Sequence, residues 1–98
     1  MERQEILAKL KEHEADLRAQ GVAHAALFGS RARGDNRPDS DIDIMVELAA
    51  DAHVGLWGYV GIIQAIEDMF PVRVDVSNHD AQRPHVRPSA ERDAIYAF

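Results

Sequence analysis

The chain has 98 residues, no cysteine and a formal net charge of −6. The absence of cysteine excludes disulfides and thiolate metal sites, and the acidic balance argues against a general nucleic-acid-binding protein, which would present a basic face. No stretch approaches the ~20 consecutive apolar residues that a membrane span requires. We therefore expect a cytoplasmic protein with a single domain over residues 1–98.

The first part of the chain predicts a helix followed by a strand. Residues 2–20 contain four apolar residues at helical spacing: Ile6, Leu7, Leu10 and Leu17. Gly21 is suited to the C-terminal end of this helix. The apolar run at residues 22–28 then predicts the first strand.

A turn segment, GSRARGDNRPDS, follows the first strand at residues 29–40. Gly29 can adopt backbone angles that are closed to other residues. Ser30 can then begin a short helix, whose free backbone N–H groups and hydroxyl would receive a phosphate. Arg31 and Arg33 add positive charge nearby. The segment therefore predicts a phosphate-binding turn.

Two aspartates open the second predicted strand, residues 41–48. Asp41 and Asp43 share one face, because successive side chains of a strand point to opposite faces. Two adjacent carboxylates are costly to bury unpaired, and they offer the hard oxygen ligands that suit Mg²⁺. If the two strands run antiparallel, Ser30 lies beside Asp41, and one corner holds both phosphate donors and metal ligands.

A second helix is predicted over residues 55–69, with a buried stripe of Leu56, Val60, Ile63 and Ile66. Three glycines recur at every third position of this helix: Gly55, Gly58 and Gly61. Interior glycine weakens a helix by up to about 1 kcal/mol relative to Ala. Close packing on the sheet is the explanation that we prefer, and close approach of a partner chain is the alternative. Partial exposure of Trp57 and Tyr59 would favour an interface.

A third strand is predicted at residues 72–77. A strand–helix–strand crossover makes parallel neighbours, so Asp75 can lie beside Asp41 and Asp43 as a third carboxylate. The alternative is an edge aspartate that pairs with Arg73. The expected fold is α+β, a small mixed β-sheet of three or four strands with helices packed against it and the second strand in the centre.

The C-terminal segment predicts a turn at residues 78–80 and a last short helix that begins near Ser89. Pro84 and Pro88 interrupt any longer helix. Three residues are expected to dock this end on the core: Ile95, Tyr96 and Phe98. His79 and His85 are not assigned to the site.

The pattern Gly29-Ser30, ten intervening residues, then Asp41-x-Asp43 resembles the signature of the DNA polymerase beta-type nucleotidyltransferase superfamily. The chain is most similar to the minimal nucleotidyltransferase (MNT) domains. These domains are commonly paired with HEPN-domain proteins as toxin–antitoxin couples. The resemblance covers nearly the whole chain in its order of elements, and the opening motif is its specific part.

The resemblance implies a polymerase beta-type nucleotidyltransferase fold, with ATP as substrate and two Mg²⁺ ions as cofactors. The catalytic and metal-binding residues would be Asp41, Asp43 and Asp75. The nucleotide-binding residues would be Gly29, Ser30, Arg31 and Arg33. The implied reaction moves AMP from ATP to a protein hydroxyl, a tyrosine of a HEPN ribonuclease toxin, so that the chain is the antitoxin of a type VII-like pair.

Two other functions stay open. The chain could neutralise its partner by stoichiometric binding without catalysis, or it could transfer a nucleotide to a small-molecule acceptor. The second is disfavoured because such enzymes usually need a larger acceptor-binding region. Neither a membrane nor direct nucleic-acid binding is expected, and homo- and hetero-oligomers are both compatible with the sequence.

Overall fold

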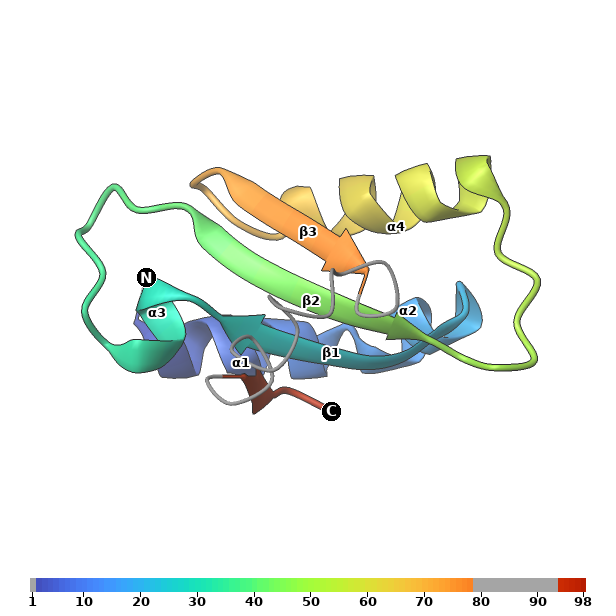
Figure 1. The fold of residues 1–98 in the computed structure, drawn as a ribbon, viewed down its shortest axis with the longest axis horizontal. Coiled ribbons are helices and arrows are strands. Elements are labelled where there is room, and N and C mark those ends of the chain that lie inside the picture. The colour runs from blue at the N-terminus through green and yellow to red at the C-terminus, as the bar shows by residue number, and fades with distance from the viewer. Residues whose placement is uncertain (1, 79–93) are drawn as a thin grey trace, which may run out of the picture.

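The computed structural model of the protein describes residues 2–78 and 94–98. Four strands form one mixed sheet in the order β3-β2-β1-β4 (Figure 1). The strands are β1 (Val22–Phe28), β2 (Ile42–Leu48), β3 (Val74–Asn78) and β4 (Ile95–Tyr96). The predicted α+β fold is confirmed, and β2 lies inside the sheet as expected.

The helices are α1 (Arg3–Glu12), α2 (Glu14–Ala19), α3 (Ser30–Arg33) and α4 (Leu56–Glu67). Figure 1 shows α1 and α2 running along β1, and α4 running along β3. None of these helices combines the length and the apolar character that crossing a membrane requires.

The single helix predicted over residues 2–20 is wrong, because the chain breaks it at His13. This residue has φ −98° and ψ 13°, outside the helical range. Its backbone N–H is shared between the carbonyls of Lys9 and Leu10, at 3.3 and 3.1 Å. Its Nδ1 also lies 3.0 Å from the Lys9 carbonyl oxygen. These bonds close α1, and α2 begins at the next residue, Glu14.

Strand pairing places the two sequence motifs side by side. β1 and β2 are antiparallel, with Phe28 opposite Asp43, and β2 and β3 are parallel, with Asp43 opposite Asp75. The second and third strands begin at Ile42 and Val74, slightly later than predicted. The Ile42 N–H donates to the Arg73 carbonyl at 2.9 Å, just ahead of the β2–β3 ladder.

One face of the sheet carries the apolar core. α1, α2 and α4 contribute Ile6, Leu10, Leu17, Ile62 and Ile66, which pack on the inward residues of the strands. The stripe predicted for α4 is wrong in three of its four residues: Ile66 is buried, but Ile63 is only half-buried, and Leu56 and Val60 are 73% and 44% exposed. Because the helix is apolar on most of its surface, its periodicity fits more than one buried stripe. The sheet selects Tyr59, Ile62, Ile66 and, after the helix, Met69.

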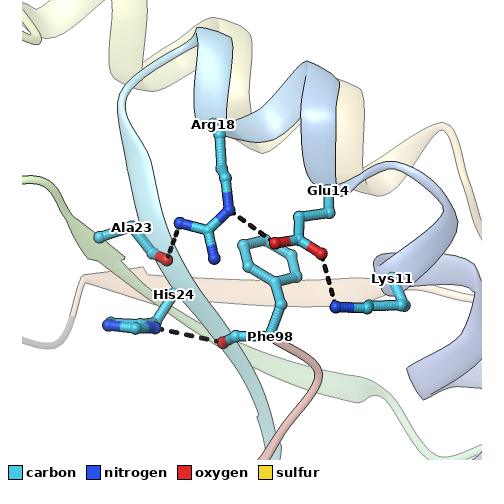
Figure 2. Close-up of polar contacts among 6 residues, drawn as sticks. All are labelled: Lys11, Glu14, Arg18, Ala23, His24 and Phe98. Carbon is cyan, nitrogen blue, oxygen red and sulfur yellow. Dashed lines mark hydrogen bonds and ion pairs between the residues drawn. The ribbon is translucent and has the colours of Figure 1, made fainter.

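The predicted docking of the C-terminal residues is confirmed, and it includes a short strand that the sequence did not reveal. Ile95 and Tyr96 pair with β1 in β4. In Figure 2 the Phe98 ring lies under the Arg18 guanidinium, 5.0 Å from ring centre to Cζ, and the Phe98 carbonyl oxygen lies 3.3 Å from His24 Nδ1. Several predictions fall on residues 79–93, outside the described residues. They are the short helix near Ser89, the last two residues of the turn at residues 78–80, and His79 and His85.

Candidate active site

Gly29 stands where β1 ends, and two features of the structure require a glycine there. Its φ is 75°, a backbone conformation that residues with a side chain rarely adopt. A Cβ at this position would also collide with the Asp43 carboxylate. The carboxylate therefore lies directly against the backbone of Gly29, which brings the two halves of the motif into contact.

Ser30 is the first residue of α3, the single helical turn that follows Gly29. The Ser30 carbonyl accepts the backbone N–H groups of Gly34 and Asp35, at 2.9 and 3.0 Å, and so closes the turn at its other end. The first N–H groups of a helix lack intrahelical partners. The expected placement of Ser30 at the start of a helical turn is confirmed, next to the residue that touches Asp43.

Three carboxylates lie at the same end of β2 and β3. Asp43 and Asp75 are register partners on parallel strands, and Asp41 lies two residues before Asp43. Burial raises the pKa of the Asp43 carboxyl, and the charges of Asp75 and Asp41 raise it further. The positive charges of Arg33 and Arg31 act in the opposite direction. A positively charged ligand would therefore favour the ionised form of Asp43.

The alternative pairing of Asp75 with Arg73 does not describe the contact that the structure shows. Arg73 Nε lies 4.0 Å from Asp41 Oδ2, and both side chains are exposed. An exposed ion pair at this distance contributes little to stability. It leaves Asp41 available to a ligand.

The carboxylates suit a hard divalent cation that is completed by its substrate. Within residues 2–78 and 94–98, no three acidic or histidine side chains are grouped closely enough to hold a metal ion by themselves. Mg²⁺, however, usually takes one or two protein carboxylates and completes its coordination with water and substrate phosphates. Burial and the neighbouring negative charges, which raise the pKa of Asp43, both disfavour its ionised form, and a bound cation favours that form, so the donor set fits Mg²⁺.

The two arginines of the motif have different environments. Arg31 is only 2% exposed. Its Nη2 donates to the Ser40 carbonyl at 2.7 Å and to the Pro38 carbonyl at 3.3 Å, so its side chain holds the loop between α3 and β2. Arg33 is exposed, and its Nε lies 3.2 Å from Asp35 Oδ2. The sequence could not separate the two arginines, because both lie on the same short turn.

Arg31→Met is expected to lower the free energy of unfolding by about 2 kcal/mol, because hydrogen bonds from a charged donor contribute about 1.5–3 kcal/mol and the loop carbonyls would lose theirs. Urea denaturation measures this change. Arg33→Met is the matched control, and we expect a change within about 0.5 kcal/mol for this exposed side chain. Equal losses in the two variants would contradict the structural role of Arg31.

Tyr59 is a residue near the site that the sequence identified only as an aromatic. Burial raises the pKa of its hydroxyl, and the charge of Asp75 raises it further. The side chain of Tyr59 packs against the core from α4. The helical phase of Tyr59 with Ile62 and Ile66 is the signal that could have placed it on the inner side of the helix.

The profile of the family described as "Nucleotidyltransferase domain" matches residues 4–97. The chain belongs to this family. The nucleotidyltransferase domain therefore spans nearly all of the chain, and the enzyme class predicted from the Gly29-Ser30 and Asp41-x-Asp43 motif is confirmed.

Relatives of this nucleotidyltransferase domain agree with the minimal form of the fold. A protein of Methanocaldococcus jannaschii, named as a candidate protein adenylyltransferase, is 36% identical over 94 residues, which are 94% of each chain. A solved structure of a candidate minimal nucleotidyltransferase has a TM-score of 0.79 and 28% identity, and the match covers 97% of this chain and 95% of that one. The predicted resemblance to minimal nucleotidyltransferases is confirmed.

A third similarity is to the crystal structure of a toxin–antitoxin with AMP-PNP. The TM-score is 0.69 at 19% identity, and the match covers 90% of this chain and 72% of that one. At this identity the comparison shows a shared fold.

Proposed function

We propose that this nucleotidyltransferase transfers AMP from ATP to a protein hydroxyl, a tyrosine of a HEPN-type ribonuclease toxin, and so acts in the cytoplasm as the antitoxin of a type VII-like pair. The observation that carries the proposal is the contact between the Asp43 carboxylate and Gly29, with Asp75 as the register partner of Asp43. The adenylyltransferase name of the M. jannaschii relative and the AMP-PNP in the toxin–antitoxin structure support the choice of chemistry.

The phosphates of ATP would bind at the start of α3. The backbone of Gly29 carries no side chain there, and the hydroxyl and N–H of Ser30 are the donors at the first helical position. Arg33, exposed on the same turn, would add a charge-assisted contact to a phosphate. Arg31 would act indirectly, by holding in place the loop between α3 and Asp41.

Asp41, Asp43 and Asp75 would hold Mg²⁺ together with the substrate phosphates, and two ions is the number that the family resemblance implies. When bound, such ions neutralise phosphate charge and stabilise the attacking and leaving oxygens of an in-line displacement. The three aspartates also orient the triphosphate relative to the acceptor, because the register of β2 and β3 determines their relative positions.

In the reaction, the acceptor hydroxyl oxygen forms a bond to the α-phosphorus of ATP while the bond from that phosphorus to the β-phosphate oxygen breaks. AMP becomes attached to the acceptor, and pyrophosphate leaves. Asp75 is exposed at the edge strand of the sheet, the side from which a protein acceptor can approach, and it would accept the proton of the hydroxyl.

Incubation with labelled ATP, Mg²⁺ and the protein encoded by the adjacent gene tests this proposal. We expect the label on a tyrosine of that protein, and none with Asp41→Asn/Asp43→Asn. Absence of label on the partner, under conditions in which the chain binds ATP, would count against it.

A non-catalytic antitoxin is the second candidate, and the exposed apolar residues of α4 favour it because they suit a protein interface. Expression of the same double variant together with the toxin separates the two functions. A binding antitoxin would still protect cells, whereas an enzyme would not.

A further inference from the structure

The outer side of α4 is an apolar helix surface that the rest of the described chain leaves exposed. Leu56, Trp57 and Val60 are 73%, 82% and 44% exposed. Residues three and four positions apart on a helix are neighbours, so Trp57, Val60 and Gly61 form one continuous surface with Leu56. We call these four residues the α4 outer face.

Gly55, at the start of α4, and Gly61 within it have no packing reason within the described residues, which overturns our preferred explanation for these two glycines. A Cβ on Gly61 or Gly55 would meet nothing within 4 Å, and one on Gly58 would meet only Val54 Cγ1, at 3.3 Å. Glycine weakens a helix interior relative to Ala. Because these residues have no side chain, the backbone of another molecule can approach the helix closely there.

A hollow of about 500 Å³ adjoins the α4 outer face. It is lined by the end of α2, the loop before α4, and Gly55 and Gly58. A side chain at position 58 would stand at this hollow, so its absence keeps the hollow open. The α4 outer face and this hollow together can receive an apolar side chain of a partner.

The charges around the face identify its occupant. Residues 49–72, which comprise α4 and the segments on either side of it, contain three acidic residues, Asp51, Glu67 and Asp68, and no Lys or Arg. Asp51 precedes α4, and Glu67 and Asp68 stand at its C-terminal end, all exposed. In a second copy of this chain, parallel or antiparallel packing of the two faces would oppose acidic ends, which is unfavourable. A partner with basic residues on both sides of an apolar stripe fits.

We infer that the α4 outer face is the docking surface for the acceptor protein, which presents an amphipathic helix with an apolar stripe flanked by Lys and Arg. This inference rests on the proposed function, because it names the surface that holds the acceptor. The face belongs to the helix that runs along β3, the edge strand that carries Asp75 (Figure 1).

Trp57→Glu tests the surface, with the protein encoded by the adjacent gene as the probe. Calorimetric titration is expected to show binding weakened at least about 30-fold, the loss typical of a central aromatic. Binding of ATP should stay unchanged. Ala8→Glu, which adds the same charge to an exposed position of α1, is the matched control and should bind the partner as the wild type does.

Gly61→Ala separates the role in binding from a role in folding. The isolated chain should become more stable, with Tm higher by a few degrees, because Ala favours the helix and meets no neighbour. Partner binding should weaken about tenfold, since the added methyl prevents close approach. A variant that is more stable and binds normally would overturn the close approach.

The results distinguish this inference from the proposed function. Asp43→Asn should bind the partner with wild-type affinity and fail to label it, whereas Trp57→Glu should lose both. If the wild type binds the partner but never labels it, the proposed function fails and the docking surface is judged by binding alone. The docking surface is overturned if Trp57→Glu binds like the wild type or if the wild type binds no partner. It is also overturned if ultracentrifugation shows a wild-type dimer that Trp57→Glu converts to a monomer.

Discussion

Asp43→Asn is expected to lower the rate of AMP transfer at least about 1,000-fold and, at the same time, to make the ligand-free protein more stable at neutral pH. The activity falls because electrostatic stabilisation and positioning supply most of the rate in such a site. The stability rises because the half-buried carboxylate lies near Asp75 and Asp41 and a neutral amide is not repelled by them. The measurements are transfer of labelled AMP and thermal unfolding without metal.

The pH dependence of this stability difference has a definite sign. The pKa of Asp43 is raised in the folded protein, first by burial and then by the charges of Asp75 and Asp41. Its protonated form therefore contributes stability below the unfolded pKa, near 4, and this contribution is lost as the pH rises through the raised folded pKa. The stability of Asp43→Asn should exceed that of the wild type at neutral pH, and the difference should shrink as the pH falls toward 4.

Two controls accompany this prediction. Asp39→Asn removes an exposed carboxylate of the preceding loop. It should change neither the rate of AMP transfer nor the pH dependence of stability. Added Mg²⁺ should raise the Tm of the wild type more than that of Asp43→Asn, because the ion relieves the repulsion at Asp43. A wild type that is more stable than the variant at neutral pH in the absence of metal would contradict the electrostatic account.

Gly29→Ala is expected to lower the free energy of unfolding by about 3 kcal/mol and transfer activity about 100-fold. One cause is the positive φ of 75°, which costs an alanine about 1–3 kcal/mol. The other is the collision of the new Cβ with the Asp43 carboxylate, which would displace the carboxylate from the start of α3. A displacement of this kind in the site can reduce the rate about 100-fold.

Gly34→Ala is the matched control for Gly29→Ala. Gly34 also has a positive φ, 83°, but a Cβ there would meet nothing within 4 Å. Its variant should therefore lose only the backbone contribution, about 1 kcal/mol, and keep most of its activity. In an Asp43→Ala background, Gly29→Ala should cost less than in the wild type, because the collision with the carboxylate is gone, but still more than Gly34→Ala, because φ 75° with ψ −155° is a conformation that essentially only glycine adopts. Equal effects of the two glycine variants in the wild-type background would show that the contact with Asp43 is unimportant.

Where the sequence succeeded, the information was local. The Gly29-Ser30 turn, the alternation around Asp41 and Asp43, and the glycine stop at Gly21 depend on backbone preferences and on the two-residue period of a strand. The structure confirms the elements that these patterns predicted. Asp75 could be placed because a strand–helix–strand unit has a fixed handedness and gives parallel strands.

Where the sequence failed, two arrangements were locally acceptable and packing chose between them. Residues 2–20 fit one helix as well as two, and the break at His13 follows from bonds to Lys9 and Leu10. The sequence of α4 fits more than one buried stripe, because apolar residues and glycines occur on most sides of the helix. The strand at Ile95 and Tyr96 is too short to show a two-residue alternation in the sequence. It forms through its pairing with β1.

The sequence by itself determined the family of this protein, its α+β composition and the residues of its acidic corner, because the spacing from Ser30 to Asp41 and Asp43 is set by a turn between adjacent strands. Only the tertiary structure decided that Arg31 holds the loop beneath that corner while Arg33 stays exposed, and that α4 turns Tyr59 inward and Trp57 outward. The physical reason is that burial is a property of the whole assembly of elements, and a residue acquires it only when the sheet and the helices have packed together.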